Sequence, residues 1–153
     1  MSKPAAGAST GQPSQAFSGL RIIDTTHVLA GPFASYQLGV LGAEVIKVEA
    51  PDDPDQARAQ GSDRAMSDIG MGTAFMAQAS NKKALALDLK TEPGREALKR
   101  LIATADVFVE NYRPGAFEEL GLGYDEMSKL NPRLIYCSIS AFGSTGPRAH
   151  LTG

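Results

Sequence analysis

An amide, an aromatic ring and a guanidinium follow one another in the sequence at Asn111, Tyr112 and Arg113. They come directly after a short, mostly apolar run, residues 107–110. Such a trio can hold a purine or a phosphate group by hydrogen bonding, stacking and bidentate charge. An ordinary structural turn explains the same residues equally well on spacing alone. The pattern therefore indicates a candidate site without naming its ligand.

Two further groups of residues have side chains that could take part in binding or catalysis. His27 follows an earlier apolar run, residues 20–24, although a histidine at such a place more often makes a structural hydrogen bond than acts as a catalyst. Asn81, Lys82 and Lys83 place two positive charges side by side. The simplest interpretation of this pair is an ordinary exposed turn.

Other motifs resemble known sites only in part. Gly121-Leu122-Gly123 lacks the third glycine of a dinucleotide fingerprint and is expected to follow a helix, so no nicotinamide site is predicted. Asp52, Asp53 and Asp55 resemble part of a calcium loop, but the glycine and the distal glutamate are missing. A solvated acidic loop is the better interpretation. The sequence contains neither a G-x-S-x-G elbow nor a P-loop lysine motif.

Composition narrows the class of protein. Fifteen Lys and Arg residues against 17 Asp and Glu residues give a formal net charge of −2, which disfavours a nucleic-acid or anionic-membrane partner. Cys137 is the single cysteine, which excludes an internal disulfide framework. His27 and His150 have no second cysteine to join them, so no zinc or other metal site is predicted.

The sequence shows no targeting or membrane segment. Residues 1–16 are small, polar and rich in Pro and Gly, and they lack the apolar stretch of a secretory signal. We predict that they form a flexible tail. No apolar run approaches the ~20 residues that cross a bilayer. We therefore expect a soluble cytoplasmic protein whose ordered part covers residues 17–153.

Short apolar runs alternate with amphipathic segments along the rest of the chain. Pro32 suits the first turn of a helix that Gly42 would end, and Thr91 suits the N-cap of a second helix. Residues 50–69 are predicted to be a long loop with room for a short helix, of the kind that is often functional. Strands are predicted at residues 20–24, 44–49, 84–89, 107–110 and 134–139, with short helices at 72–79 and within 117–130.

This alternation predicts an α/β fold with a mostly parallel sheet of about five strands. In such sheets, ligands bind in the loops that follow the carboxyl ends of the strands. Here those loops are predicted to begin near Thr25, Ala50, Leu89, Asn111 and Ser140. The candidate trio at Asn111 therefore falls on the predicted binding rim.

The segments taken together resemble the amino-terminal part of the family III coenzyme A transferases. That family includes formyl-CoA and carnitine CoA-transferases and the 2-methylacyl-CoA racemases. Each matching motif is weak alone, but they occur in order and with ordinary spacing. The matching stretches are residues 20–24, 30–34, 41–49, 81–83, 87–90, 105–115, 120–124, 131–136 and 142–147.

The resemblance implies a Rossmann-like α/β fold, a mostly parallel sheet with flanking helices. Residues 17–153 would be the truncated N-terminal portion of a larger CoA-transferase domain. It also implies a site for coenzyme A, with acyl-CoA as a substrate and no permanently bound cofactor. The positions that contact the coenzyme in the family correspond to Ala30, Leu87, Asp88, Leu89, Lys90, Asn111, Tyr112 and Arg113. His27 lies beside this site and is included in the predicted set.

Within this set the resemblance implies separate roles. Lys90 and Arg113 would meet the nucleotide phosphates, and Tyr112 would pack on the adenosine portion. Ala50 and Glu119 stand where some transferases carry arginine, so these two positions are not assigned to the site.

The implied reaction is transfer of coenzyme A between carboxylic acids. An aspartate carboxylate attacks the acyl-CoA thioester, and the resulting mixed anhydride is converted to an aspartyl-CoA thioester by the CoA thiolate. The position of that aspartate lies beyond Gly153, and His150 precedes the histidine position of the racemases. No catalytic residue is therefore assigned, and we expect this fragment alone to be inactive.

Two alternatives stay open beside the transferase. One is a 2-methylacyl-CoA racemase, in which a histidine pairs with the corresponding aspartate to exchange an α-proton. The other, of a different class, is a non-catalytic CoA-binding fragment. Family members form interlocked dimers, so a homodimer is expected for the full-length protein. The partners implied are an acyl-CoA and a small carboxylic acid whose identity the sequence leaves open.

Overall fold

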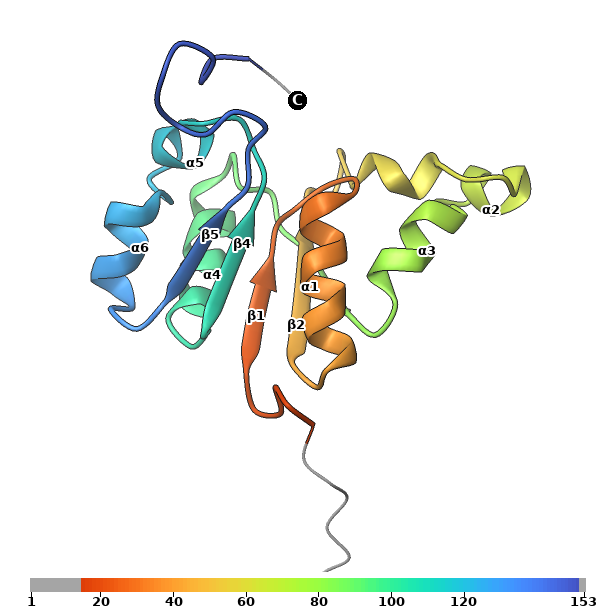
Figure 1. The fold of residues 1–153 in the computed structure, drawn as a ribbon, viewed down its shortest axis with the longest axis horizontal. Helices are drawn as coiled ribbons and strands as arrows, with labels where there is room; N and C mark the ends of the chain where they lie inside the picture. Colours follow the sequence, from red (N-terminus) through yellow and green to blue (C-terminus); the bar gives the residue numbers. More distant parts are fainter. Residues whose placement is uncertain (1–14, 152–153) are drawn as a thin grey trace, which may run out of the picture.

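The computed structural model describes residues 15–151, which form a five-stranded sheet with helices around it (Figure 1). All neighbouring strands are parallel, in the order β3-β2-β1-β4-β5. The predicted α/β fold with a parallel sheet of five strands is confirmed. The strands are β1 (Arg21–Asp24), β2 (Glu44–Glu49), β3 (Lys83–Ala86), β4 (Val107–Glu110) and β5 (Ile135–Ser138).

Helical segments connect each strand to the next. The helix α1 (Ala30–Val40) joins β1 to β2, and α4 (Glu92–Ile102) joins β3 to β4. The long predicted loop after β2 contains a 3₁₀ helix and a short α-helix, followed by a third helix. The shorter segments are η1 (Gln56–Ala59), α2 (Arg64–Asp68), α3 (Thr73–Ala79), α5 (Ala116–Glu119) and α6 (Tyr124–Leu130).

Local sequence determines where the two long helices begin and end. Pro32 lies in the first turn of α1, where its missing N–H leaves no helical hydrogen bond unmade. Gly42 has a φ of +108° just past the end of α1, a conformation that glycine adopts without a Cβ penalty. The Thr91 side chain accepts a hydrogen bond from the Gly94 N–H at 3.2 Å and caps α4. The predicted positions of these signals are confirmed.

A helical layer covers each face of the sheet, with α1 in front and α4 behind in Figure 1. Successive side chains of a strand point to opposite faces, so Ile22 and Ile23 belong to different packing clusters. Ile22 packs on the α1 side with Val45 and Val109. Ile23 packs on the α4 side, in a larger cluster that includes Leu98 and Ile102 of α4, Phe108, Phe117 and Met127.

The third strand is shorter than the predicted range of residues 84–89. It ends at Ala86 because its partner β2 ends at Glu49, the residue with which Ala86 is paired. One more hydrogen bond, from the Leu87 N–H to the Glu49 carbonyl at 2.9 Å, follows the ladder. Leu87 and the next three residues then leave the sheet at its carboxyl edge. Residues 87–89, which were predicted to be part of the strand, therefore belong to a loop on the binding rim.

Of the predicted tail, residues 1–14 lie outside the part of the chain that the structure describes. None of the helices within residues 15–151 combines the length and the apolar character that a membrane span requires.

Candidate functional site

A cleft of about 990 Å³ lies at the carboxyl ends of the strands. Loops that follow all five strands contribute to its walls. The nine residues predicted as coenzyme contacts all line this one cleft, although they come from three separate loops. They are His27 and Ala30, then Leu87, Asp88, Leu89 and Lys90, and then Asn111, Tyr112 and Arg113. The structure thus brings the predicted set together, and its binding of coenzyme A stays a prediction.

The cleft lies where the order of the strands reverses. The chain passes from β1 to β2 on one side and later places β4 on the other side of β1, so the connections diverge above β1. This is the switch point at which doubly wound sheets bind ligands. The loops after β1 and β4 are tied together there by His27 and Asn111. The His27 N–H donates to Asn111 Oδ1 at 2.8 Å, and Asn111 Nδ2 donates to the His27 carbonyl at 2.8 Å.

The side chains of His27 and Tyr112 also meet in the cleft. His27 Nε2 lies 2.8 Å from the Tyr112 hydroxyl oxygen, and the two rings pack edge to face with centroids 5.2 Å apart. Burial lowers the pKa of His27 below 6.5, so the imidazole is neutral at pH 7. Burial also raises the pKa of Tyr112 to about 12. The pair therefore offers an uncharged imidazole and an aromatic ring, a surface suited to stacking and hydrogen bonding.

Two cations, Lys90 and Arg113, stand on the rim of the cleft with their side chains exposed. The Arg113 guanidinium donates to Glu119 Oε2 at 2.7 Å, and both of these side chains are about 60% exposed. Exposed cations of this kind can meet a phosphate that arrives from solvent. Glu119 occupies one side of the Arg113 guanidinium and would compete with such a phosphate.

The loop after β3 is held by close contact with α4. A Cβ placed on Gly94 would lie 1.9 Å from the Asp88 carbonyl oxygen, so only glycine permits this approach. Leu87 and Leu89 are half-buried and pack against the main hydrophobic cluster. Asp88 Oδ1 accepts a hydrogen bond from the Lys90 N–H at 2.9 Å. The wall that carries Lys90 is therefore anchored to the core.

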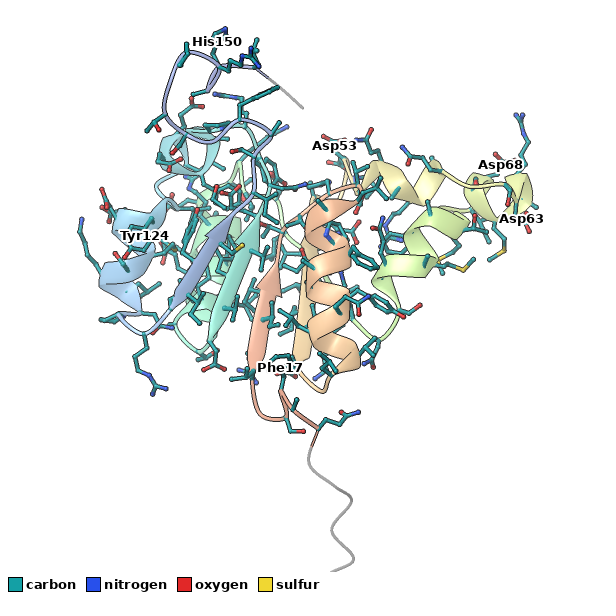
Figure 2. The ribbon with its side chains drawn as sticks, viewed as in Figure 1. Phe17, Asp53, Asp63, Asp68, Tyr124 and His150 are labelled. Atoms are coloured by element: carbon teal, nitrogen blue, oxygen red, sulfur yellow. The ribbon has the colours of Figure 1, made fainter. Side chains whose placement is uncertain are left out.

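The loop after β2 forms an acidic wall. Figure 2 shows Asp53 at the carboxyl edge of the sheet, on the side opposite Phe17. Glu49 lies deeper and is bound by Arg58 through Nε at 2.8 Å and Nη2 at 2.6 Å. Burial opposes its ionisation, but the hydrogen bonds from Arg58 hold the pKa of Glu49 below its ordinary value. The Arg58 guanidinium itself lies 3.8 Å from the centre of the Phe75 ring.

Two buried ion pairs close to the segment that joins β1 to α1 were not predicted. Lys82 Nζ lies 2.9 Å from Asp24 Oδ2, with the side chains 2% and 0% exposed. Lys47 Nζ lies 3.0 Å from Asp55 Oδ2, with the side chains 2% and 1% exposed. The interpretation of Lys82 as part of an ordinary exposed turn is therefore wrong for its side chain. The interpretation of Asp55 as part of a solvated loop is also wrong, whereas Asp52 and Asp53 are exposed.

One signal in the sequence pointed toward these pairs. Asp24 and Lys47 stand next to apolar residues in their own strands, and a charge buried in such a strand requires a partner. Burial raises the pKa of Asp24, but the charges of Lys82 and Lys47 outweigh this effect and hold it below 3.8. No local pattern indicated which residue would pair with Asp24, because Lys82 is 58 residues away in the sequence.

His150 lies on the loop after β5, above α5 in the view of Figure 2. It is not among the residues that line the cleft. Within residues 15–151, no group of three or more His, Cys, Asp or Glu side chains is arranged to hold a metal ion.

Comparison with known proteins gives the family of this α/β protein with a switch-point cleft. Residues 17–153 match the model of CoA-transferase family III. The chain belongs to that family. It is 48% identical over 135 residues to the succinyl-CoA:glutarate CoA-transferase of Mus musculus, covering 88% of this chain and 30% of the mouse protein. It is 43% identical over 139 residues to the acetyl-CoA:oxalate CoA-transferase of Acetobacter aceti, covering 91% of this chain and 35% of that protein.

Solved structures show the same fold. A CAIB/BAIF family protein from Brucella suis superimposes with a TM-score of 0.82 at 37% identity, over 92% of this chain and 37% of that one. The protein Rv3272 of Mycobacterium tuberculosis superimposes with a TM-score of 0.80 at 39% identity, over 94% of this chain and 37% of that one. The chain thus spans about a third of the length of the relatives it matches.

Proposed function

We propose that the cleft binds coenzyme A and that the protein transfers CoA between carboxylic acids. The observation that supports this most directly is the convergence of the nine predicted contacts on one cleft at the switch point. The family and the named relatives, which are CoA-transferases, support the same class of reaction. They favour transfer over the racemase alternative.

The proposed binding mode follows from the chemistry of the cleft walls. Lys90 and Arg113 take the nucleotide phosphates at the exposed rim, since they are the cations on that edge. Tyr112 packs on the adenosine portion, and its hydroxyl is held by His27 at 2.8 Å. The half-buried Leu87 and Leu89 supply the apolar part of the wall. The pantetheine arm then runs toward Ala30 at the start of α1.

The proposed reaction proceeds through covalent intermediates on an aspartate that we place outside the described residues. Its carboxylate attacks the acyl-CoA thioester and releases the CoA thiolate, leaving a mixed anhydride. The thiolate attacks the aspartyl carbonyl of the anhydride and releases the donor acid, forming an aspartyl-CoA thioester. The acceptor carboxylate then reverses both steps and leaves as the new acyl-CoA. Asp24 is excluded from this role because it is fully buried and paired with Lys82.

Titration calorimetry with coenzyme A tests the binding part of the proposal. Arg113→Ala is expected to weaken binding by at least about tenfold, since a charge-assisted contact to phosphate is worth about 1.5–3 kcal/mol. Arg133→Ala is the matched control, because Arg133 is exposed just before β5 and is not among the residues that line the cleft. Equal affinities of the parent chain and Arg113→Ala would remove Arg113 from the site.

A separate experiment tests whether this chain binds CoA without supplying the attacking carboxylate. We incubate the 153-residue chain with an acyl-CoA and a carboxylate acceptor, and follow CoA exchange by mass. The proposal expects CoA binding without exchange, because the attacking carboxylate is placed elsewhere. Turnover above a denatured control would assign the nucleophile to an acid of this chain, with Asp88 the first to test since it lines the cleft.

A further inference from the structure

The turn between β1 and α1 is held almost entirely by side chains from other parts of the chain. Residues 26–28 contain six backbone N–H and C=O groups, and each is bound by a side chain rather than by another backbone group. The N–H groups of Thr26, His27 and Val28 donate to Asp24 Oδ1, Asn111 Oδ1 and Asp55 Oδ1, at 2.9, 2.8 and 2.9 Å. The corresponding carbonyls accept from Lys47 Nζ at 2.7 Å, Asn111 Nδ2 at 2.8 Å and Gln78 Nε2.

Val28 adopts a backbone conformation that its side chain disfavours. Its φ is +68°, in the left-handed region. A β-branched residue rarely takes this conformation because its Cβ substituents crowd the backbone. Among the non-glycine residues in the described range 15–151, only Asn81 shares a positive φ, and asparagine tolerates it far better. The conformation of Val28 therefore depends on the groups that hold it.

Those groups come from two segments that are themselves fixed. Gln78 is a buried residue of α3, 4% exposed. Asp55 is 1% exposed, and its Oδ1 also accepts from the Ala57 N–H at 3.0 Å. Its Oδ2 faces Lys47 Nζ at 3.0 Å. Asp55 thus holds the N–H group of Val28, and Gln78 holds its carbonyl group.

The turn determines which of its residues face the cleft. His27 lies between Thr26 and Val28, whose backbone groups are held by side chains, so the direction of its ring toward Tyr112 depends on the turn. Leu29 and Ala30, which follow Val28, also line the cleft. A strained segment that is over-determined by its surroundings is a common feature of ligand sites, since it is organised before the ligand arrives.

We propose that Gln78 and Asp55 are positioning residues of the cleft, which hold Val28 in its left-handed conformation and so preorganise the His27–Ala30 segment for ligand. The inference rests on the proposed binding of coenzyme A. Neither Gln78 nor Asp55 lines the cleft, so neither side chain forms part of its wall, whereas both hold the turn that does.

The test uses Gln78→Met in the 153-residue chain, because methionine keeps the length of the side chain but cannot donate to the Val28 carbonyl. We expect CoA affinity to fall about fivefold, the equivalent of one lost hydrogen bond. Gln37→Met is the matched control, since Gln37 is exposed on α1 and outside the cleft lining. Asp55→Asn is less suitable as the main variant because it leaves Lys47 buried without its counter-charge.

The decisive variant adds Val28→Gly to Gln78→Met. Val28 itself lines the cleft, so the reference for the double variant is Val28→Gly alone. Glycine adopts a positive φ without strain, so the turn should return to its conformation and CoA affinity should recover to within about twofold of Val28→Gly. A role of Gln78 in general packing would not be rescued by removing a second side chain. Unchanged affinity in Gln78→Met, or no recovery in the double variant, would overturn the proposal.

Hydrogen exchange of the His27 and Val28 amides separates this inference from the proposed function. Exchange should be faster in Gln78→Met than in the parent and slower again in the double variant, with or without ligand. If the parent binds no coenzyme A while this exchange pattern holds, the proposed function fails and the positioning role stands. If the exchange pattern is absent, the positioning role fails whatever the affinity.

Discussion

Asn111 binds the backbone of His27 from both sides, accepting from its N–H and donating to its carbonyl at 2.8 Å each. The two residues are 84 positions apart and follow β1 and β4, which are neighbours in the sheet. A primary amide is the side chain that offers one acceptor and one donor at this spacing. The contact therefore continues the pairing of β1 and β4 beyond the ends of the strands, into the cleft.

Replacing this amide should destabilise the fold as well as the cleft. Asn111→Leu has a similar volume but leaves both groups of His27 without a partner, and we expect it to lower the free energy of unfolding by about 2–3 kcal/mol. Urea denaturation followed by circular dichroism measures the loss. Asn111→Gln keeps both groups on a longer arm and should lose less. Equal midpoints for the parent and Asn111→Leu would contradict the structural role.

The adjacent lysines Lys82 and Lys83 should respond very differently to the same substitution. Lys82→Met leaves Asp24 buried without its ion-pair partner, which costs about 3–5 kcal/mol. Lys83→Met removes one of the two cations that pair with Glu44 at the surface, which is worth about 1 kcal/mol or less. Adding Asp24→Asn to Lys82→Met should cost less than the sum of the two single changes. Similar losses for the two lysines would contradict the burial of Lys82.

The stability of the protein should fall as pH drops below neutral, in part through His27. Burial holds the pKa of His27 in the folded state below its ordinary value of 6.5. The unfolded chain therefore binds the proton first, and the contribution of His27 to stability, complete above pH 6.5, is lost as pH falls toward the folded pKa. Urea midpoints at pH 7.5 and 5.5 should differ more for the parent than for His27→Gln. The same pH dependence in both proteins would argue against a depressed pKa at His27.

Glu119 should weaken the affinity of the cleft for a phosphate ligand. Its carboxylate pairs with Arg113 at 2.7 Å on the exposed rim. Glu119→Gln is expected to improve CoA affinity by up to about fivefold at low salt, the range of one exposed ion pair, and the gain should shrink at high salt. Glu126→Gln is the matched control, since Glu126 makes a comparable exposed pair with Lys129 at 2.8 Å on α6. A gain of the same size in both variants would show a general effect of charge.

The sequence alone was sufficient to determine the architecture and the rim of the cleft. Strand formation depends on local runs of apolar residues, and helix ends depend on single residues such as Thr91 and Gly42, so both can be recognised along the chain. Because parallel strands place their carboxyl ends at one edge, the loops predicted to begin near Thr25, Leu89 and Asn111 were expected to converge. The structure places them around one cleft.

The tertiary structure alone decided which charged residues are buried and which backbone groups they hold. Lys82 and Lys83 are adjacent and chemically identical in the sequence, yet one side chain is 2% exposed and the other 70%. The difference arises because Lys82 meets Asp24, 58 residues earlier, against α1. Likewise, the left-handed turn at Val28 is held by Asp55 and by Gln78 of α3, both from later parts of the chain. Local preference opposes that conformation, so no local pattern could predict it, and only long-range contacts stabilise it.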